Sequence, residues 1–571
     1  MLNKDTIFRL FVALVAGICG YLFFGTWYPW HFAVREQAQL LMLTPGTILS
    51  YMQEPAWLAC YLGDYLTQFF FHPRLGICLL VVVLLLTWWV GARLLRRVVD
   101  YAHIELYALF PLAAEMVMLG RIDYPLSMPF VLLLSLLFAG ICLRIRQPAI
   151  SVVVGILVLP LVYGLAGYGV YLFLLTVIAV ELARGELRLS YWLVLAAEAV
   201  VVPLSLSDYF QLEGREVFCY PAVERVWLFP ALTWLVVIVM LTLVPRRRFY
   251  MNWREQAAVW SLSFLLLVGG LAITTDFHRE KMLAIGAAYD RGEWEEVARL
   301  AEDFEEPDLV ATYYRNLALF RDGQLPERLF DYPQPYGGRA LLLPMDALDF
   351  PDTFAPCEAY FALGDWNMAR YTARRAMEVC PKSQSVRGVK RLAEIYQEAG
   401  DSLAMHKYLT ILERTWFYAD WARKQEVKRD TTEVADVPLG LRDPSDARET
   451  LFRLAELQPK RREVIDFVLC YCLLERDLAS FVEAYRRWGT AHYSEPPCIY
   501  AEALLLQMPP ESGRRKRGRR AEKLPFGITE TQMKAFQDYR TAARLAGHRR
   551  EALEAAYGTT YWFYDEFRDE K

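Results

Sequence analysis

Long apolar runs fill the chain before about residue 275, whereas charged residues after that point recur at helical spacing. A bilayer core about 30 Å thick needs roughly 20 apolar residues per helix, because a spanning backbone has to satisfy its own hydrogen bonds. The pattern therefore predicts an all-α protein in which residues 1–275 form a polytopic transmembrane domain. About nine spans are expected, at 8–28, 75–95, 104–120, 125–143, 149–166, 168–183, 190–206, 226–244 and 257–275.

Lysine and arginine residues indicate how these spans are oriented. The start, MLNKDTIFRLFVALVAGICGYLFFGTW, has a basic end but an apolar stretch too long for a signal peptide, so we interpret it as an uncleaved first span. Short cytoplasmic loops are rich in Lys and Arg. With nine spans and a cytoplasmic N-terminus, the inner side receives Lys4, Arg9, Arg93, Arg96, Arg97, Arg144, Arg146, Arg184, Arg188, Arg246, Arg247, Arg248 and Arg254. The outer side receives only Arg35, Arg74, Arg121, Arg215 and Arg225. An odd number of spans then places residues 276–571 outside the cytoplasm, with the spans in a bacterial inner membrane.

The first outer loop, residues 29–74, is long, aromatic and amphipathic, which predicts short helices lying along the outer interface. Acidic and basic side chains collect in this loop and in the second outer loop, GRIDYP. They are His31, Arg35, Glu36, Glu54, Asp64, His72 and Arg74 in the first loop, and Arg121 and Asp123 in the second. Two interpretations stay open: solvated interfacial charges, or a functional site at one leaflet.

Acids also fall inside predicted spans: 104–120 carries Glu105 and Glu115, and Glu198 lies near the middle of 190–206. An ionisable group at that depth is expensive and usually faces a partner or a cavity. Glu198 is therefore a functional candidate. The alternative is a protonated or hydrogen-bonded Glu that holds helices together.

Residues 276–571 have the pattern of soluble helices that stack in pairs. In CEAYFALGDWNMARYTARRAMEVCP the apolar positions recur every three or four residues, at Trp366, Ala369, Ala373, Ala376, Met377 and Cys380. This stretch resembles a tetratricopeptide repeat, although Ala373 stands where that repeat has an aromatic residue. Weaker copies around Gly292, Gly323 and Gly400 predict an α-solenoid over 276–571, and such solenoids present a concave face to peptides or protein partners.

Composition narrows the range of functions. The net charge is −4 and the pI is about 6.1, which gives no overall attraction to nucleic acid. The ten Cys residues lack the paired spacing of a structural zinc site, so no metal framework is inferred. No Walker, HExxH or GxSxG motif is present, which disfavours an ATPase, a zinc protease and a serine hydrolase and leaves the cofactor unknown. Cys357 and Cys380 are candidates for a disulfide or for two buried thiols. The basic run RRKRGRR, residues 514–520, is either a solvated loop or a binder of phosphate-rich lipid or glycan.

Several segments together point to a family. EQAQLLMLTPGTILSYMQEPAWLACYLGDYLTQFF, YYRNLALFRDGQLPERLFDYPQP and the repeats resemble an uncharacterised bacterial family of multi-pass proteins with tetratricopeptide-like C-termini. A more distant similarity is to the GT-C membrane glycosyltransferases, which use polyprenyl-phosphate-linked sugars. That resemblance implies Glu36 as general base or metal ligand, with Asp64, Arg121 and Asp123 in the same catalytic group. It further implies that Arg35, His72, Arg74 or Arg121 neutralises the lipid phosphate.

Three functions are therefore expected, in order of preference. The first is an envelope scaffold whose spans anchor a solenoid that binds a protein or peptide partner. The second is a GT-C-type transferase acting on a lipid-linked glycan at the outer leaflet. The third is a transporter that relays protons through Glu198, for which no inverted repeat is visible.

Overall fold

The computed structural model describes residues 4–99, 103–145, 148–185, 189–243, 252–304, 306–345, 348, 350–425, 446–508 and 525–568. Every regular element in these ranges is helical, which confirms the all-α class. The chain forms two compact units. Unit 1 contains Met1–Glu280 and Thr410–Gln425, and unit 2 contains Lys281–Leu409 and Glu426–Lys571. RRKRGRR lies outside the described residues.

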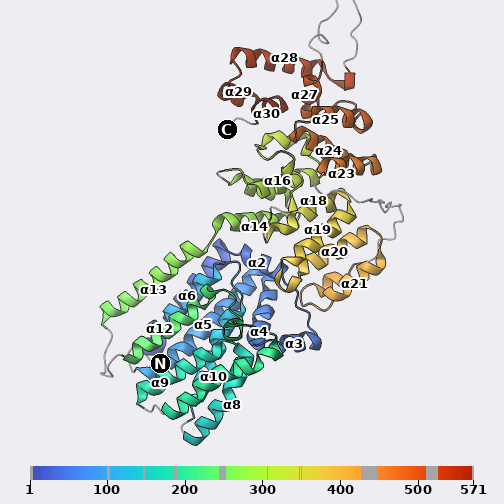
Figure 1. Cartoon of the computed structure of the whole chain (residues 1–571). Coiled ribbons are helices and arrows are strands. Elements are labelled where there is room, and N and C mark those ends of the chain that lie inside the picture. Colours follow the sequence, from blue (N-terminus) through green and yellow to red (C-terminus); the bar gives the residue numbers. More distant parts are fainter. Residues whose placement is uncertain are drawn as a thin grey trace, which may run out of the picture. The chain divides into compact units, whose positions relative to one another are not determined.

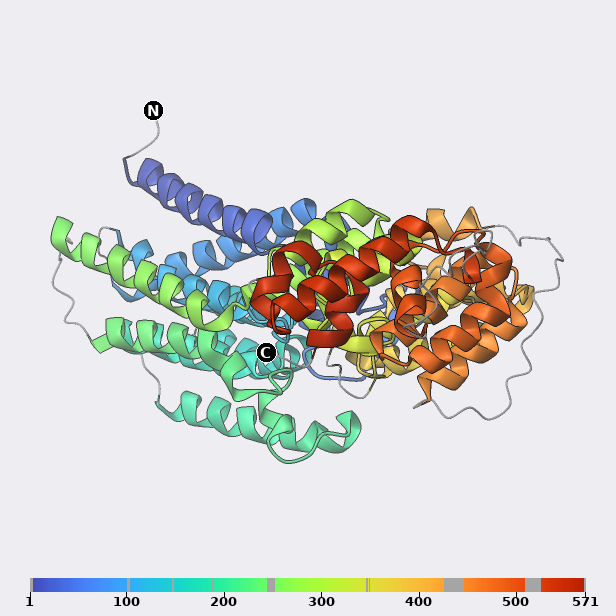
Figure 2. The same ribbon diagram turned by 90° about the horizontal axis from the view of Figure 1, so that it is seen from above.

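Unit 1 is a bundle in which each predicted span corresponds to a helix or to part of one. Figures 1 and 2 show its long helices running in roughly the same direction. They are α1 (Lys4–Leu22), α5 (Pro73–Val98), α6 (Leu109–Leu119), α7 (Ser127–Cys142), α8 (Pro148–Ala166), α9 (Gly169–Arg184), α10 (Leu189–Phe210), α12 (Phe229–Leu243) and α13 (Trp253–Thr274).

Five stretches are long and apolar enough to cross a membrane: Thr6–Trp27, Pro73–Val98, Trp192–Phe210, Arg225–Leu243 and Trp253–Thr274. Ser127–Cys142 and Val153–Ala166 are apolar but shorter. The predicted span 104–120 divides into a 3-10 turn, Ile104–Leu106, and the 11-residue α6. At 1.5 Å per residue α6 measures about 16 Å, roughly half a bilayer core. Helix length thus supports five crossings, and the count of nine stays a prediction.

Glu105 explains why the chain turns before α6. Its side chain is 2% exposed and forms ion pairs with Arg9 Nε at 3.2 Å and Arg96 Nη2 at 3.0 Å. The Trp88 indole donates to its backbone carbonyl at 3.1 Å. A buried carboxylate needs such partners. The acid therefore joins α1, α5 and the turn instead of facing lipid.

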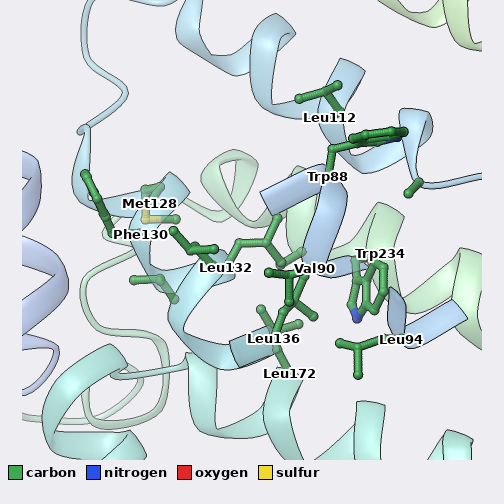
Figure 3. Close-up of a cluster of buried hydrophobic side chains, with 14 of the residues drawn as sticks. Trp88, Val90, Leu94, Leu112, Met128, Phe130, Leu132, Leu136, Leu172 and Trp234 are labelled. Atoms are coloured by element: carbon green, nitrogen blue, oxygen red, sulfur yellow. The ribbon is translucent and has the colours of Figure 1, made fainter. Parts of the chain in front are cut away.

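The core of unit 1 lies where α5, α6, α7, α9 and α12 meet. Figure 3 shows Trp88, Leu136, Leu172 and Trp234 among the buried side chains that fill it. The indole of Trp234 is fully buried and donates to Thr176 Oγ1 at 2.9 Å. Burial of large aromatic and aliphatic side chains is the main stabilising term in such a core.

The peripheral helices of unit 1 expose apolar side chains. Only 17% of an 18-residue apolar window is buried in Thr6–Trp27, Trp192–Phe210 and Trp253–Thr274, against 56% in Pro73–Val98. Leu14, Val201 and Leu265 are each at least 60% exposed. Soluble proteins rarely expose contiguous apolar surface on this scale. The periphery is therefore suited to contact with lipid.

The loop between α1 and α5 folds into short helices, as expected. They are α2 (Trp30–Gln37), α3 (Pro45–Tyr51), α4 (Trp57–Thr67) and a 3-10 turn, Gln68–Phe71. Their packing differs from a simple surface position, because α4 contacts α7 and α8 of the bundle. Gly63 makes this possible: a Cβ at that position would lie 2.5 Å from Ser127 N and 2.7 Å from Leu126 C. The absent side chain lets α4 approach the backbone at the start of α7.

Unit 2 consists of helices joined by tight turns. Neighbouring pairs are α15 (Trp294–Glu302) with α16 (Leu309–Arg321), α18 (Ala355–Leu363) with α19 (Trp366–Glu378), α20 (Val386–Glu398) with α21 (Ser402–Leu412), and α23 (Ala447–Leu457) with α24 (Arg462–Leu474). Gly364 and Gly400 adopt φ of +77° and +74° at two of the turns, a conformation that glycine reaches without a steric penalty. The predicted stripe is buried at Ala369, Ala373 and Ala376. Its likeness to the tetratricopeptide repeat stays a prediction.

The cysteine pair and the aromatic C-terminus both belong to the interior of unit 2. Cys357 and Cys380 are free and buried, and their Sγ atoms face backbone carbonyls. Burial raises the pKa of the Cys357 thiol to about 12, so it is an unreactive core residue. In the terminal helix α30 (Tyr561–Phe567), Tyr564 donates to Leu474 O at 2.8 Å and its ring lies 4.8 Å from that of Phe330. The aromatic segment thus closes unit 2.

We expect Gly63→Ala to lower the free energy of unfolding by about 1–3 kcal/mol, because the added methyl group meets backbone that cannot move aside. Thermal unfolding of the purified protein in detergent measures this. The matched control is Gly164→Ala in α8, where a Cβ would have no neighbour within 4 Å. The control should be neutral or slightly stabilising. Equal effects of the two substitutions would contradict the close approach of α4.

Candidate functional site

A segment from the second half of the chain packs against the first loop of unit 1. We call residues 410–425, which include α22 (Ala419–Arg423), the returning segment. Leu43 N donates to Arg414 O at 2.7 Å. Phe417 stacks on Phe71 with ring centroids 5.2 Å apart, and Trp416 lies 6.2 Å from Tyr65. The loop and the returning segment therefore form one surface.

Glu36 is the most buried acid of the first loop. It lies on α2, whose inward positions also include His31 and Phe32, and Phe32 stacks on Phe70 at 4.6 Å. The Glu36 side chain is 6% exposed, and Tyr418 Oη of the returning segment donates to its Oε2 at 3.0 Å. A hydroxyl donor lowers the cost of burying a carboxylate. Glu36 is thus covered by a residue 382 positions away.

The beginning of α2 is held by Glu280, an acid that the sequence did not single out. The backbone nitrogens of Trp30 and His31 donate to its carboxylate, the second at 3.2 Å. The His31 ring approaches Glu280 through Nδ1 at 3.5 Å and Leu119 O through Nε2 at 3.1 Å. Burial lowers the pKa of His31, and the hydrogen bond to Glu280 opposes this only in part. His31 is therefore a neutral positioning residue at pH 7.

Arg35 and Arg121 support the second loop. Arg35 donates through Nε to Ile122 O at 3.0 Å and through Nη2 to Arg121 O. Burial lowers the pKa of Arg35 to about 10, so it stays charged at neutral pH. Arg121 is partly exposed and pairs with Asp123 at 2.6 Å and with Glu224 at 3.3 Å. Burial opposes ionisation of Asp123, but the hydrogen bond and charge of Arg121 outweigh it and lower the pKa of Asp123.

The remaining acidic and basic residues of the first loop either accept a hydrogen bond from a tyrosine or are exposed. Tyr51 donates to the Asp64 carboxylate, and Tyr220 donates to that of Glu54. Burial raises the pKa of both tyrosines, so their hydroxyls stay protonated donors. His72 and Arg74 are exposed at the start of α5. The structure thus brings Arg35, Arg121 and Asp123 together in one contact network. Glu36 and Asp64 each accept a hydrogen bond from a different tyrosine. His72 and Arg74 are exposed.

The two acids singled out within predicted spans, Glu115 and Glu198, have different surroundings. Glu115 is 2% exposed, accepts from Tyr124 Oη at 2.9 Å, and lines a cavity of about 10 Å³ together with Thr87, Trp88 and Trp234. That volume is the space of about one water molecule. Glu198 is half-buried, and its Oε2 has no hydrogen-bond partner among the described residues. The described parts of the chain contain no group of three or more His, Cys, Asp or Glu placed to hold a metal ion.

Sequence reasoning missed the partners that complete this surface, namely Tyr51, Tyr220, Glu224, Glu280 and Tyr418. One signal was available. The stretch TWFYADW, residues 415–421, is unusually aromatic for a turn between soluble helices. Its aromatic side chains contact Phe69, Phe71 and His72 of the first loop.

We expect Tyr418→Phe to loosen the returning segment, because a hydrogen bond to a buried charged group contributes about 1.5–3 kcal/mol. Tryptic cleavage after Arg414 should become roughly tenfold faster or more, since that peptide is cut only when the segment opens. The matched control is Tyr371→Phe on α19, an exposed tyrosine of unit 2. Cleavage at the wild-type rate in Tyr418→Phe would show that the contact with Glu36 does not hold the segment.

Comparison with known proteins identifies a family and no activity. No match to the chain is found among curated proteins or among solved structures. The similarities to tetratricopeptide repeats and to GT-C transferases therefore stay predictions. One family model matches residues 4–568, nearly the whole chain. The chain belongs to DUF6057, a family of unknown function.

Proposed function

We propose that the protein is a membrane-anchored scaffold of the bacterial cell envelope. In this proposal unit 1 spans the inner membrane with a cytoplasmic N-terminus, and the solenoid of residues 276–571 stands outside the cytoplasm, where it binds a protein or peptide partner. The distribution of Lys and Arg among the predicted loops supports this orientation. The apolar periphery of unit 1 supports insertion in a bilayer.

The main support for the proposal is the set of hydrogen bonds and ion pairs that the polar side chains of the outer loops form. Arg35 donates to backbone carbonyls, Arg121 is neutralised by two acids, and Asp64 accepts from a tyrosine. Side chains with such hydrogen bonds and ion pairs stabilise the structure of the loops. They fit an anchor better than a catalytic centre, whose groups have to be accessible to a substrate.

Unit 2 supplies the surface for a partner. The side chains of Tyr371 and Arg375 on α19, and of Val379 directly after it, are each about half exposed, while the opposite face of the helix is buried. Stacked helix pairs commonly bind partners through such exposed faces. Aromatic and arginine side chains are enriched in protein interfaces.

A GT-C-type transferase is the second candidate, and Glu36 is the observation that favours it. Its carboxylate is buried in the first loop beside a tyrosine hydroxyl, and two exposed basic residues, His72 and Arg74, lie on the same loop. A general base requires such a positioned acid, and a lipid phosphate requires exposed cations. A transporter is the third candidate, supported by the Oε2 of Glu198, which has no hydrogen-bond partner in the described part of the chain.

Two substitutions separate the first two candidates. Glu36→Gln keeps the shape of the side chain and an acceptor for Tyr418, and Arg121→Ala removes the charge from the second loop. We expect both full-length variants to retain the partners captured by in-cell cross-linking and to support growth as the sole copy in the cell. The matched control is Glu213→Gln, an exposed acid of unit 1.

Mass spectrometry of the cross-linked partners and the growth rate give independent readouts. Loss of growth in both variants, with normal membrane levels and an unchanged partner set, would contradict the scaffold and favour the transferase. Normal growth of both variants would contradict the transferase as a candidate function.

A further inference from the structure

An apolar patch stays exposed where the first loop meets the returning segment. We call it the outer apolar patch. Leu49 and Trp416 are its most exposed members, at 62% and 54%. The others are at least 38% exposed and comprise Leu43, Ile48, Met52, Phe71 and Leu75. Three of the residues belong to α3 or follow it directly, and Tyr51 on the same helix turns inward. Helix α3 is therefore apolar on its outward side.

Contacts within unit 1 hold these residues together as one surface. The Tyr51 ring lies 5.6 Å from Tyr61, Tyr61 lies 6.1 Å from Tyr65, and Tyr65 lies 6.2 Å from Trp416. A backbone hydrogen bond from Leu43 to Arg414 joins the start of α3 to the returning segment. The patch is thus built from two parts of the chain that are more than 340 residues apart in sequence.

The patch continues into the apolar periphery of the bundle. Leu75 lies in the first turn of α5, and farther along the same helix Val82 and Leu86 are 56% and 42% exposed. Helix α5 is one of the five stretches able to cross a membrane. Exposed apolar side chains therefore recur from Phe71 into a candidate span, with the exposed His72 and Arg74 between Phe71 and Leu75.

Charged side chains flank the Trp416 end of the patch. Glu413 and Arg414 precede the aromatic residues and are exposed, and Asp420 and Arg423 follow them and are 84% and 61% exposed. Aromatic rings between exposed charges and an apolar surface are typical of the headgroup layer of a bilayer, where one end of the ring is apolar and the other is hydrated.

We propose that the outer apolar patch lies in the headgroup layer of the outer leaflet, so that the returning segment is a membrane-interface anchor supplied by the second half of the chain. The inference rests on the insertion of unit 1 in a bilayer and goes beyond it. It assigns lipid as the partner of Trp416 and α3. Continuity with α5 favours lipid over a second protein, because a protein partner would have to exclude lipid along the same helix.

Photocrosslinking to lipid tests the proposal. Benzoylphenylalanine is placed in the full chain at Leu49, Trp416, Val82 or Leu403, one position at a time, and each protein is reconstituted in nanodiscs of phosphatidylethanolamine and phosphatidylglycerol. Val82 is the positive control on a candidate span. Leu403, on α21 of unit 2, is 86% exposed and is the negative control. Lipid adducts are counted by intact-protein mass spectrometry after each variant has shown the wild-type elution volume.

We expect adducts at positions 49, 416 and 82, with yields about tenfold or more above that at position 403. Adducts at position 82 alone would overturn the interface anchor while leaving the membrane insertion of unit 1 in place. Absence of adducts at position 82 would overturn both the insertion and the anchor. Equal yields at all four positions would also overturn the anchor, since exposure alone would then explain the reaction.

Discussion

An apolar surface that faces outward from a helical bundle has to be covered by something other than water, and the structure of unit 1 depends on this constraint. Its central helices bury Trp88 and Trp234 in a packed core, whereas Thr6–Trp27, Trp192–Phe210 and Trp253–Thr274 turn most of their apolar side chains outward. Burying a large aliphatic side chain contributes about 1.5–3 kcal/mol, and exposing many of them to water forfeits that contribution. A lipid bilayer can cover these apolar side chains, so that no further protein is needed to keep them from water.

The same constraint decides where the charges of unit 1 can lie. Glu105, Glu36 and Glu280 are each nearly buried, and each accepts hydrogen bonds or ion pairs from distant parts of the chain. Removing one partner of a buried charge usually costs more than the pair contributes, because the remaining charge is left without compensation. These acids therefore stabilise contacts between distant segments of the chain. Glu36 differs from the other two because it accepts a hydrogen bond from Tyr418, which belongs to the returning segment.

The sequence was sufficient for features that local pattern determines. Apolar runs identified every helix of the bundle, because a helix that faces lipid or a core must be apolar over its length. The turn glycines of unit 2 and the stripe at Ala369, Ala373 and Ala376 follow from helical spacing in the same way. Helix length was less predictable: Glu105 and Glu115 made 104–120 a weak span, but hydropathy did not show that the chain would turn at Ile104–Leu106 and begin α6 at Leu109.

Long-range pairing was the part that the sequence could not supply. Glu280 contacts the start of α2 across 249 residues, and Tyr418 contacts Glu36 across 382 residues. No periodicity or short motif encodes a contact of that separation. For this reason the candidate acids and bases could be named from their positions in the loops. Their ion pairs with one another and their hydrogen bonds with tyrosines were visible only in the structure. The aromatic stretch TWFYADW was the one local signal of the returning segment.

The central claim is that unit 1 crosses a membrane and presents unit 2 on the side opposite the cytoplasm. Labelling of single cysteines in intact cells with a membrane-impermeant maleimide tests it directly. One cysteine replaces Leu403 on α21, and the other replaces Arg144 in a predicted cytoplasmic loop, each in a chain whose native cysteines have been replaced. The account predicts labelling at position 403 in intact cells and labelling at position 144 only after permeabilisation. Labelling of position 144 in intact cells, with position 403 protected, would contradict it.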